Sequence, residues 1–283
     1  MKALYLDCAA GISGNMFLGA CIQLGVPEKY LRQELDKLKL SNEYVLEISD
    51  AIKNGIGAAY ANVVFHHDHI HEFEPEKILH EHNGIHHHAA HHHAHRTMAD
   101  IRKIITESAL SDGVKDTALK IFTVIAEAEG KVHNKPADEV HFHEVGAVDS
   151  IVDIVGCAVC VDYLDVEKIF VGRINVGSGF VKCAHGLMMV PAPATAELLQ
   201  NFKTYSYEIG KELTTPTGAA IVRALAEFSA NLPEDFTSEK IGYGAGSHDL
   251  PIPNVLRVYL GECSGNAERQ LVKLETNIDD MNP

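Results

Sequence analysis

The chain has 283 residues, of which 46% are hydrophobic and 22% are charged, so it can bury the core of one large or two ordinary domains. Its formal net charge of −15 argues against nucleic acid and against an anionic membrane surface as partners. The six cysteines lack zinc-finger spacing, which is typical of reduced thiols in a cytosolic protein.

Two apolar stretches have the hydrophobicity of a targeting or membrane segment, but neither fits one. Asp7 interrupts the apolar run at the N-terminus, which argues against a secretion signal. The run from 151 to 164 contains Asp153 and Asp162 and is too short to span a bilayer. The sequence therefore predicts a cytoplasmic protein without a membrane partner.

The N-terminal segment predicts a buried strand over 3–7, a glycine-rich turn and a helix over 16–24. Asp7 ends the strand, where ligand-facing carboxylates are common. Ser13 and Gly14 precede the helix, so Ser13 either caps it or binds a phosphate. The pattern is neither a P-loop nor a dinucleotide fingerprint.

A second helix is expected over 27–39, and strands 43–50 and 58–65 are expected to form a hairpin around Asn54-Gly55.

Residues 66–95 contain thirteen histidines and few apolar residues, which predicts a flexible loop without a fold of its own. An expression tag or low-complexity drift would also produce histidine runs, but an internal, irregular run favours metal capture or buffering. The expected metal ligands in this loop are His66, His67, His69, His71, His86, His87, His88, His91, His92, His93 and His95.

A second candidate metal site lies at the centre of the chain, in the segment V-H-F-H-E-V-G-A-V-D-S-I-V-D over 140–153. His141 and His143 are two residues apart, so they share one side of a short extended segment. Asp149 and Asp153 share one face of a helix that is expected to begin near residue 147. With Glu144, these side chains suit nickel, zinc or iron. The alternative is a capped helix with both aspartates simply solvated.

Helices are expected from Thr97, with Asp100 completing a near capping box, and from Ser111 or Asp112. After the central helix, a strand is expected over 168–176, an extended segment over 180–183 and a helix over 195–199. His185 lies in a predicted tight turn, where it is either structural or a candidate acid or base.

Further along, the hydroxyls of Thr215 and Thr217 with Gly218 open a helix over 219–228, either as an anion cradle or simply as a cap. Residues 241–246 are rich in glycine, which suits close approach to a ligand or turns, and late strands are expected over 255–260 and 271–276. The irregular alternation predicts a mixed α/β (α+β) fold, with a mixed sheet, flanking helices and the inserted histidine loop.

Several stretches, in the same order along nearly the whole chain, resemble the LarC family of nickel-insertion proteins of nickel-pincer cofactor biosynthesis. They are D-C-A-A-G-I-S-G-N-M at 7–16, the histidine segment ending in His95-Arg96, 140–154, A-H-G-L-M-M-V-P-A-P-A at 184–194, E-L-T-T-P-T-G-A-A at 212–220, G-Y-G-A-G at 242–246, P-N-V-L-R at 253–257 and L-E-T-N-I-D-D-M-N-P at 274–283.

The resemblance implies a nickel chelatase of the lyase class, which places Ni(II) into pyridinium-3,5-bisthiocarboxylic acid mononucleotide. The product is the pincer cofactor that lactate racemase apoprotein receives. Family members couple insertion to CTP with Mn(II) or Mg(II). Loss of the ring proton would need a base, for which Glu144, Asp7 and His185 are candidates, and the substrate phosphate would bind at Ser13-Gly14 or Thr215–Gly218.

The sequence departs from the family pattern at Asn15, where an Asp is expected. It also stops at Pro283, within a segment that continues in longer members. We therefore expect a nickel-handling domain over 1–265 and, over 266–283, a linker or first strand of a C-terminal LarC domain that binds CTP. A nickel store or metallochaperone and a zinc-dependent hydrolase remain competing functions, and the sequence leaves open whether the chain forms a homo-oligomer.

Overall fold

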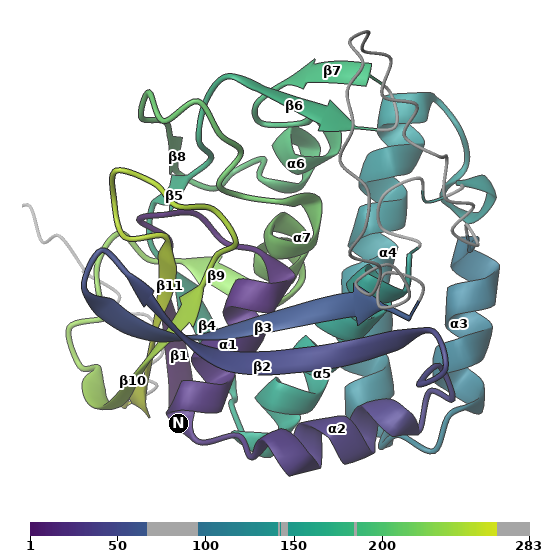
Figure 1. Cartoon of the computed structure of the whole chain (residues 1–283), viewed down its shortest axis with the longest axis horizontal. Helices are drawn as coiled ribbons and strands as arrows, with labels where there is room; N and C mark the ends of the chain where they lie inside the picture. Colours follow the sequence, from purple (N-terminus) through teal and green to yellow (C-terminus); the bar gives the residue numbers. More distant parts are fainter. Residues whose placement is uncertain (67–95, 141, 143–146, 184–185, 265–283) are drawn as a thin grey trace, which may run out of the picture.

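The computed structural model describes residues 1–66, 96–140, 142, 147–183 and 186–264 (Figure 1). The strand expected over 271–276, the linker or first strand expected over 266–283 and the histidines from 67 to 95 lie outside these ranges. In the described part, seven strands form one mixed sheet in the order β2-β3-β10-β11-β1-β4-β9. The predicted mixed α/β class is confirmed.

The N-terminal strand β1 (Lys2–Asp7) is an interior strand of the sheet and pairs with two strands from distant parts of the chain. It runs antiparallel to β11 (Val255–Glu262) and parallel to β4 (Lys168–Val171). Leu4 and Leu6 on β1 are fully buried, as expected for a central strand. Outward from β11 lies β10 (Thr237–Ala245), antiparallel to it, and outward from β4 lies β9 (Ala226–Phe228), parallel to it.

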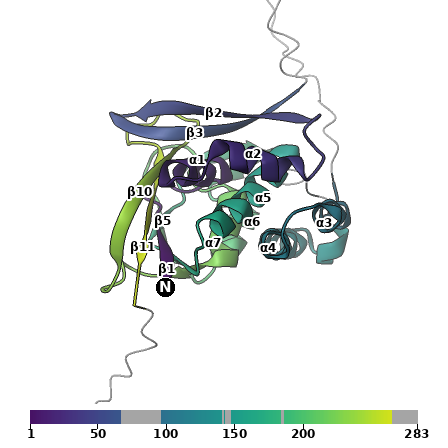
Figure 2. The same ribbon diagram turned by 90° about the horizontal axis from the view of Figure 1, so that it is seen from below.

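The other edge of the sheet is the predicted hairpin, formed by β2 (Tyr44–Lys53) and β3 (Ile56–Phe65). Its turn residues Asn54 and Gly55 both have positive φ angles, 48° and 84°, which is the conformation of a type I′ turn. Figure 2 shows the hairpin lying across α1 (Gly14–Leu24) and α2 (Glu28–Asp36). The predicted hairpin is therefore confirmed.

Helix α1 packs closely on the sheet because glycines of β10 leave room for its backbone. A Cβ atom at Gly244 would lie 1.7 Å from the carbonyl oxygen of Met16, and one at Gly242 would lie 2.3 Å from that of Ala20. The glycine-rich run therefore does allow a close approach, but by a helix. The helices lie on the face of the sheet against which α1 packs (Figure 2). Together with the sheet, α1, α5 (Val148–Tyr163) and α7 (Pro216–Leu225) form one hydrophobic core.

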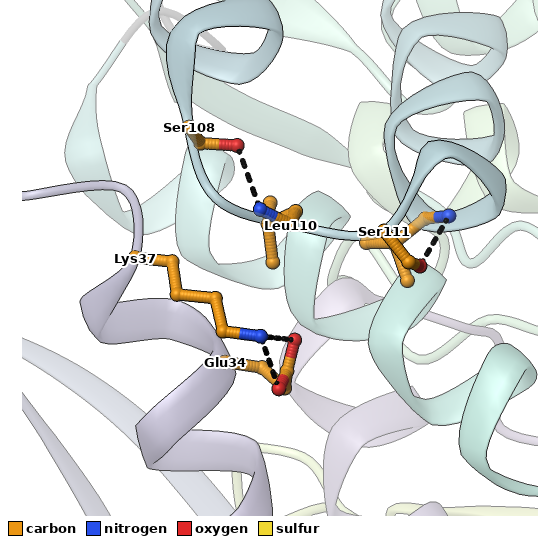
Figure 3. Close-up of polar contacts among 6 residues, drawn as sticks. Glu34, Lys37, Ser108, Leu110 and Ser111 are labelled. Carbon is orange, nitrogen blue, oxygen red and sulfur yellow. Dashed lines mark hydrogen bonds and ion pairs between the residues drawn. The ribbon is translucent and has the colours of Figure 1, made fainter.

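The helices α3 (Met98–Glu107) and α4 (Asp112–His133) begin where the sequence predicts. Thr97 and Asp100 form a complete capping box at α3. Between the two helices, the Ser108 hydroxyl accepts a hydrogen bond from the Leu110 N–H, and Ser111 caps α4 by accepting one from Val114 (Figure 3). A 3₁₀ turn, η2 (Ala137–Glu139), follows α4.

Four expected elements differ from the structure. The strand expected over 168–176 is broken into β4 and β5 (Ile174–Asn175), and β5 pairs with β8 (Thr204–Tyr205) instead of with the main sheet. The segment after 185 is a strand, β7 (Gly186–Met189), which forms a hairpin with β6 (Phe180–Cys183). Helix α6 spans Pro193–Leu198. The helix expected to reach 228 ends at Leu225, because Ala226 turns to an extended conformation and starts β9.

Within the described ranges, no helix combines the length and apolar character that crossing a membrane requires. 

Candidate functional site

The two anion cradles that the sequence suggests separately lie side by side. The Thr215 N–H donates to the carbonyl oxygen of Ile12 at 3.1 Å, and Ile12 bridges to Thr214 in a parallel arrangement. A Cβ atom at Gly218 would lie 2.1 Å from that same carbonyl, so only glycine permits this contact. As a result, the segment that leads into α1 and the segment that leads into α7 are adjacent.

The hydroxyl groups at these two helix starts have different roles. Thr215 acts as a cap: its Oγ1 accepts from the Gly218 N–H at 3.3 Å and shares a 2.9 Å hydrogen bond with the Thr217 hydroxyl. Ser13 makes no such capping bond and donates instead to Oδ1 of Asn15, at 2.6 Å. The cap interpretation therefore holds for Thr215, while Ser13 orients the side chain of Asn15.

A carboxyl group from a third helix occupies the start of α1. Asp153 of α5 is half-buried, and a Cβ atom at Gly14 would lie 2.5 Å from its Oδ2. The Asn15 N–H donates a hydrogen bond to this carboxyl, so Asp153 satisfies a free donor of the α1 N-terminus. Its other oxygen, Oδ1, is buried and has no hydrogen-bond partner among the residues that the structure describes.

The burial of Asp153 changes its acidity. Burial raises the pKa of this carboxyl well above the ordinary value, the negative charge of Asp149 raises it further, and the Asn15 N–H opposes both effects. Asp149 lies one turn earlier on α5, is half-buried, and accepts a 2.7 Å hydrogen bond from the Ser150 N–H. The alternative that both aspartates are simply solvated therefore fails for Asp153.

The other candidate ligands of the central segment, His141, His143 and Glu144, lie outside the described residues, as does His185. Their neighbours Val140 and Phe142 are buried in the core, where the Phe142 ring lies 6.4 Å from that of Phe122 on α4. Of the histidine loop only His66 is described; it is exposed and its Nε2 lies 3.1 Å from the Ser41 carbonyl. Among the placed residues alone, no three His, Cys, Asp or Glu side chains are arranged to hold a metal ion.

A cavity of about 310 Å³ opens where α1 and α7 begin. Ser13, Asn15 and Thr215 line it. Lys182 of β6 and Lys211 add two cations to the lining, which also includes Glu212 and His248. Cations and helix N-termini in one cavity suit an anionic ligand. Sequence reasoning missed both lysines, because a single lysine in a strand or loop carries no signal of a site.

Asp7 lines a second cavity, of about 340 Å³, which shares no lining residue with the first. The carboxyl lies opposite Arg257 in the antiparallel register of β1 and β11, and its Oδ2 accepts from the Arg257 Nε at 3.0 Å and from Nη2. This pairing raises the pKa of the Arg257 guanidinium against the opposing effect of burial. Asp7 is thus a paired carboxylate at the wall of a cavity.

Comparison with known proteins adds to this geometry. Residues 4–283 match the model of the family described as nickel insertion protein. The chain is 52% identical to the pyridinium-3,5-bisthiocarboxylic acid mononucleotide nickel insertion protein of Clostridium acetobutylicum, with 100% of this chain and 70% of that protein aligned. Proteins of the same name from Clostridium kluyveri and Akkermansia muciniphila are 51% and 47% identical, again over 100% of this chain and over 68% and 66% of theirs. No solved structure matches the chain.

The chain thus spans about two thirds of the length of these relatives. The family match covers all but the first three residues, and it includes the loop before α1, the start of α7, and the strands β10 and β11 that border the two cavities. The resemblance drawn from the motifs is confirmed. The chain belongs to the nickel insertion protein family.

Proposed function

We propose that this chain binds Ni(II) and inserts it into pyridinium-3,5-bisthiocarboxylic acid mononucleotide. The observation that carries the proposal is the cavity at the adjacent starts of α1 and α7, with Lys182 and Lys211 in its walls. A mononucleotide offers one dianionic phosphate, which such a cavity suits. The names of the relatives, which specify this mononucleotide and nickel, support the same assignment.

The phosphate binds at the start of α7 rather than at Ser13-Gly14. The carboxyl of Asp153 already takes the Asn15 N–H at the start of α1 and fills the space over Gly14. Lys182 and Lys211 therefore bind the phosphate in the cavity beside Thr215, whose Oγ1 keeps the capping bond from the Gly218 N–H.

Nickel is the cargo. The histidine loop gathers it, and the site formed by His141, His143, Glu144, Asp149 and Asp153 holds it for transfer. The buried Oδ1 of Asp153, which has no partner among the described residues, supports this role, because a buried carboxylate oxygen without a donor is costly unless a proton or a cation neutralises it. Borderline divalent metals accept such a mixture of imidazole and carboxylate.

Insertion replaces the hydrogen on the ring carbon between the two thiocarboxylates by nickel. The ring proton passes to a base, for which Glu144, His185 and Asp7 are the candidates, and the two sulfurs complete the pincer. Of these, Asp7 is the described one, and its pairing with Arg257 holds it at a fixed place in the wall of its cavity.

The wider function includes partners outside these residues. We propose that insertion uses CTP with Mn(II) or Mg(II), bound by a C-terminal domain, and that the product passes to lactate racemase apoprotein in the cytoplasm. Such a domain agrees with the greater length of the relatives. The reaction makes the protein a nickel chelatase of the lyase class.

The test is the appearance of the pincer's absorbance when nickel and the bisthiocarboxylate mononucleotide are added to the chain. It is run with the chain alone, with CTP, and with the C-terminal portion of the Clostridium acetobutylicum relative. Insertion that is lost in His141→Ala/His143→Ala but only slowed by deletion of residues 67–95 supports the proposal. Tight binding of several nickel ions without insertion in any mixture would favour a nickel store instead.

A further inference from the structure

The second cavity has the composition of a binding site for a flat ring. Three of the nine tyrosines of the chain, Tyr205, Tyr207 and Tyr243, line its 340 Å³. They come from two separate segments: Tyr205 and Tyr207 from β8 and the loop directly after it, and Tyr243 from β10. Such a volume, walled by aromatic rings with a few polar groups, is typical of small-molecule sites.

The tyrosine rings are held in place yet accessible. The rings of Tyr205 and Tyr207 lie 5.3 Å apart at 76°, an edge-to-face arrangement that fixes both. Arg173 lies over the Tyr205 ring at 5.0 Å, which further restrains that ring. Tyr207 is nevertheless 58% exposed, so a face of its ring is free to meet a ligand. Apolar side chains of Ile56 and Ile252 complete the walls.

A charged pair gives this cavity its polar specificity. Arg257 uses Nε and Nη2 for Asp7, and its guanidinium also hydrogen-bonds Tyr243. A guanidinium has five donors, and the Arg257 side chain is 43% exposed, so donors remain for a ligand. Asp7, 25% exposed, places a negative charge beside them. The cavity therefore offers a cation the Asp7 carboxylate and the tyrosine faces. Beside them, the remaining guanidinium N–H groups of Arg257 can bind a carboxylate-like anion.

We propose that this cavity binds the positively charged heteroaromatic ring of a pyridinium mononucleotide, with Arg257 on a carboxylate or thiocarboxylate substituent of that ring. The inference deepens the proposed function and rests on it for the identity of the natural ligand. A pyridinium cation fits tyrosine faces and Asp7, whereas a neutral ring would gain stacking alone. The assignment also explains why Asp7 and Arg257 face a cavity at all, since an ion pair that served only the sheet would not need one.

Two commercial mononucleotides test this assignment. Nicotinic acid mononucleotide carries a pyridinium ring, one carboxylate, and a ribose phosphate; nicotinamide mononucleotide differs only in an uncharged amide. Calorimetric titration of the full chain should show tighter binding of the acid. Tyr207→Ala should weaken both ligands about fivefold through loss of ring contact. Arg257→Lys, which keeps a cation for Asp7, should weaken the acid about tenfold and the amide little.

Tyr163→Ala is the matched control, because Tyr163 is also an exposed tyrosine, 43% accessible, but lies at the end of α5 against Tyr30. It should bind both mononucleotides as the unmodified chain does. Unchanged affinities in Tyr207→Ala and Arg257→Lys, or no binding of either mononucleotide by the unmodified chain, would overturn the inference. Binding that follows the expected pattern, in a protein that inserts no nickel under any condition, would instead remove the proposed function and leave the ring site standing.

Discussion

The carboxyl of Asp153 on α5 lies directly over Gly14, the first residue of α1, and takes the N–H of Asn15. Two segments 139 positions apart in the chain thereby form one structural unit: an acidic side chain placed at a helix N-terminus, where the helix dipole favours it. The contact requires glycine, because a methyl group at residue 14 has no room beside Asp153.

Gly14→Ala is therefore expected to destabilise the protein by about 1–3 kcal/mol, since the added methyl group must displace Asp153 or the start of α1. Urea denaturation followed by far-UV circular dichroism measures the change. Gly57→Ala is the matched control, because a Cβ atom at Gly57 on β3 would meet nothing within 4 Å. Equal unfolding midpoints for the two variants would contradict the tight contact.

The acidity of Asp153 predicts a pH dependence. Its folded-state pKa is raised by burial and by Asp149, so the folded protein holds a proton that the unfolded chain releases near pH 4. The stability contributed by this group is present below about pH 4 and is lost as the pH rises through the raised pKa. Asp153→Asn removes this titration while keeping an oxygen acceptor for the Asn15 N–H.

We therefore expect the stability of Asp153→Asn, relative to the unmodified protein, to increase as the pH rises from about 4 to about 8. Urea unfolding at several pH values with a chelator present measures it. Asp149→Asn removes the second cause of the raised pKa and should reduce the pH dependence without abolishing it. Stability curves of Asp153→Asn and the unmodified protein that run parallel over this range would rule out the buried proton.

Local signals in the sequence predict local structure well. The Asn54-Gly55 turn and the Thr97–Asp100 capping box follow from conformational preferences of the residues themselves, and both are present. Similarly, Asp7 and Thr215 belong to short motifs that predict a ligand site, and each lines a cavity.

The sequence does not predict which of these residues lie close together in the folded protein. The pairing of Asp7 with Arg257 depends on β11 entering the sheet beside β1, a contact between residues 250 positions apart. Likewise, Lys182 reaches the anion cavity only because β6 and β7 form a hairpin that the sequence analysis missed. Such contacts depend on the topology of the fold, which the spacing of residues along the sequence does not reveal.

The capping box at α3 provides a third prediction. Thr97→Ala should cost about 1 kcal/mol, because the Asp100 N–H loses its acceptor, while Thr97→Ser should retain most of the stability. The hydrogen bonds from Thr97 lower the pKa of Asp100, so the box contributes fully above about pH 4 and its contribution is lost as the pH falls through the lowered pKa. Thermal unfolding at neutral and acidic pH measures both effects. A deficit of Thr97→Ala that grows on acidification would be inconsistent with this sign.

The buried thiols provide a fourth prediction, which bears on where nickel binds. Cys8, Cys21, Cys157, Cys160 and Cys263 are all buried. Burial raises the pKa of the Cys8, Cys21 and Cys157 thiols, which keeps them protonated and unreactive near neutral pH. The variant Cys183→Ser contains only these five thiols. Ellman's reagent should therefore react slowly with this variant in its native state and rapidly with all five thiols in denaturant. If imidazole and carboxylate ligands hold nickel, as we propose, one equivalent of nickel should leave the slow rate unchanged. A thiol that nickel protects from the reagent would instead place a thiolate among the nickel ligands, and fast reaction of the metal-free native protein would contradict the burial of the thiols.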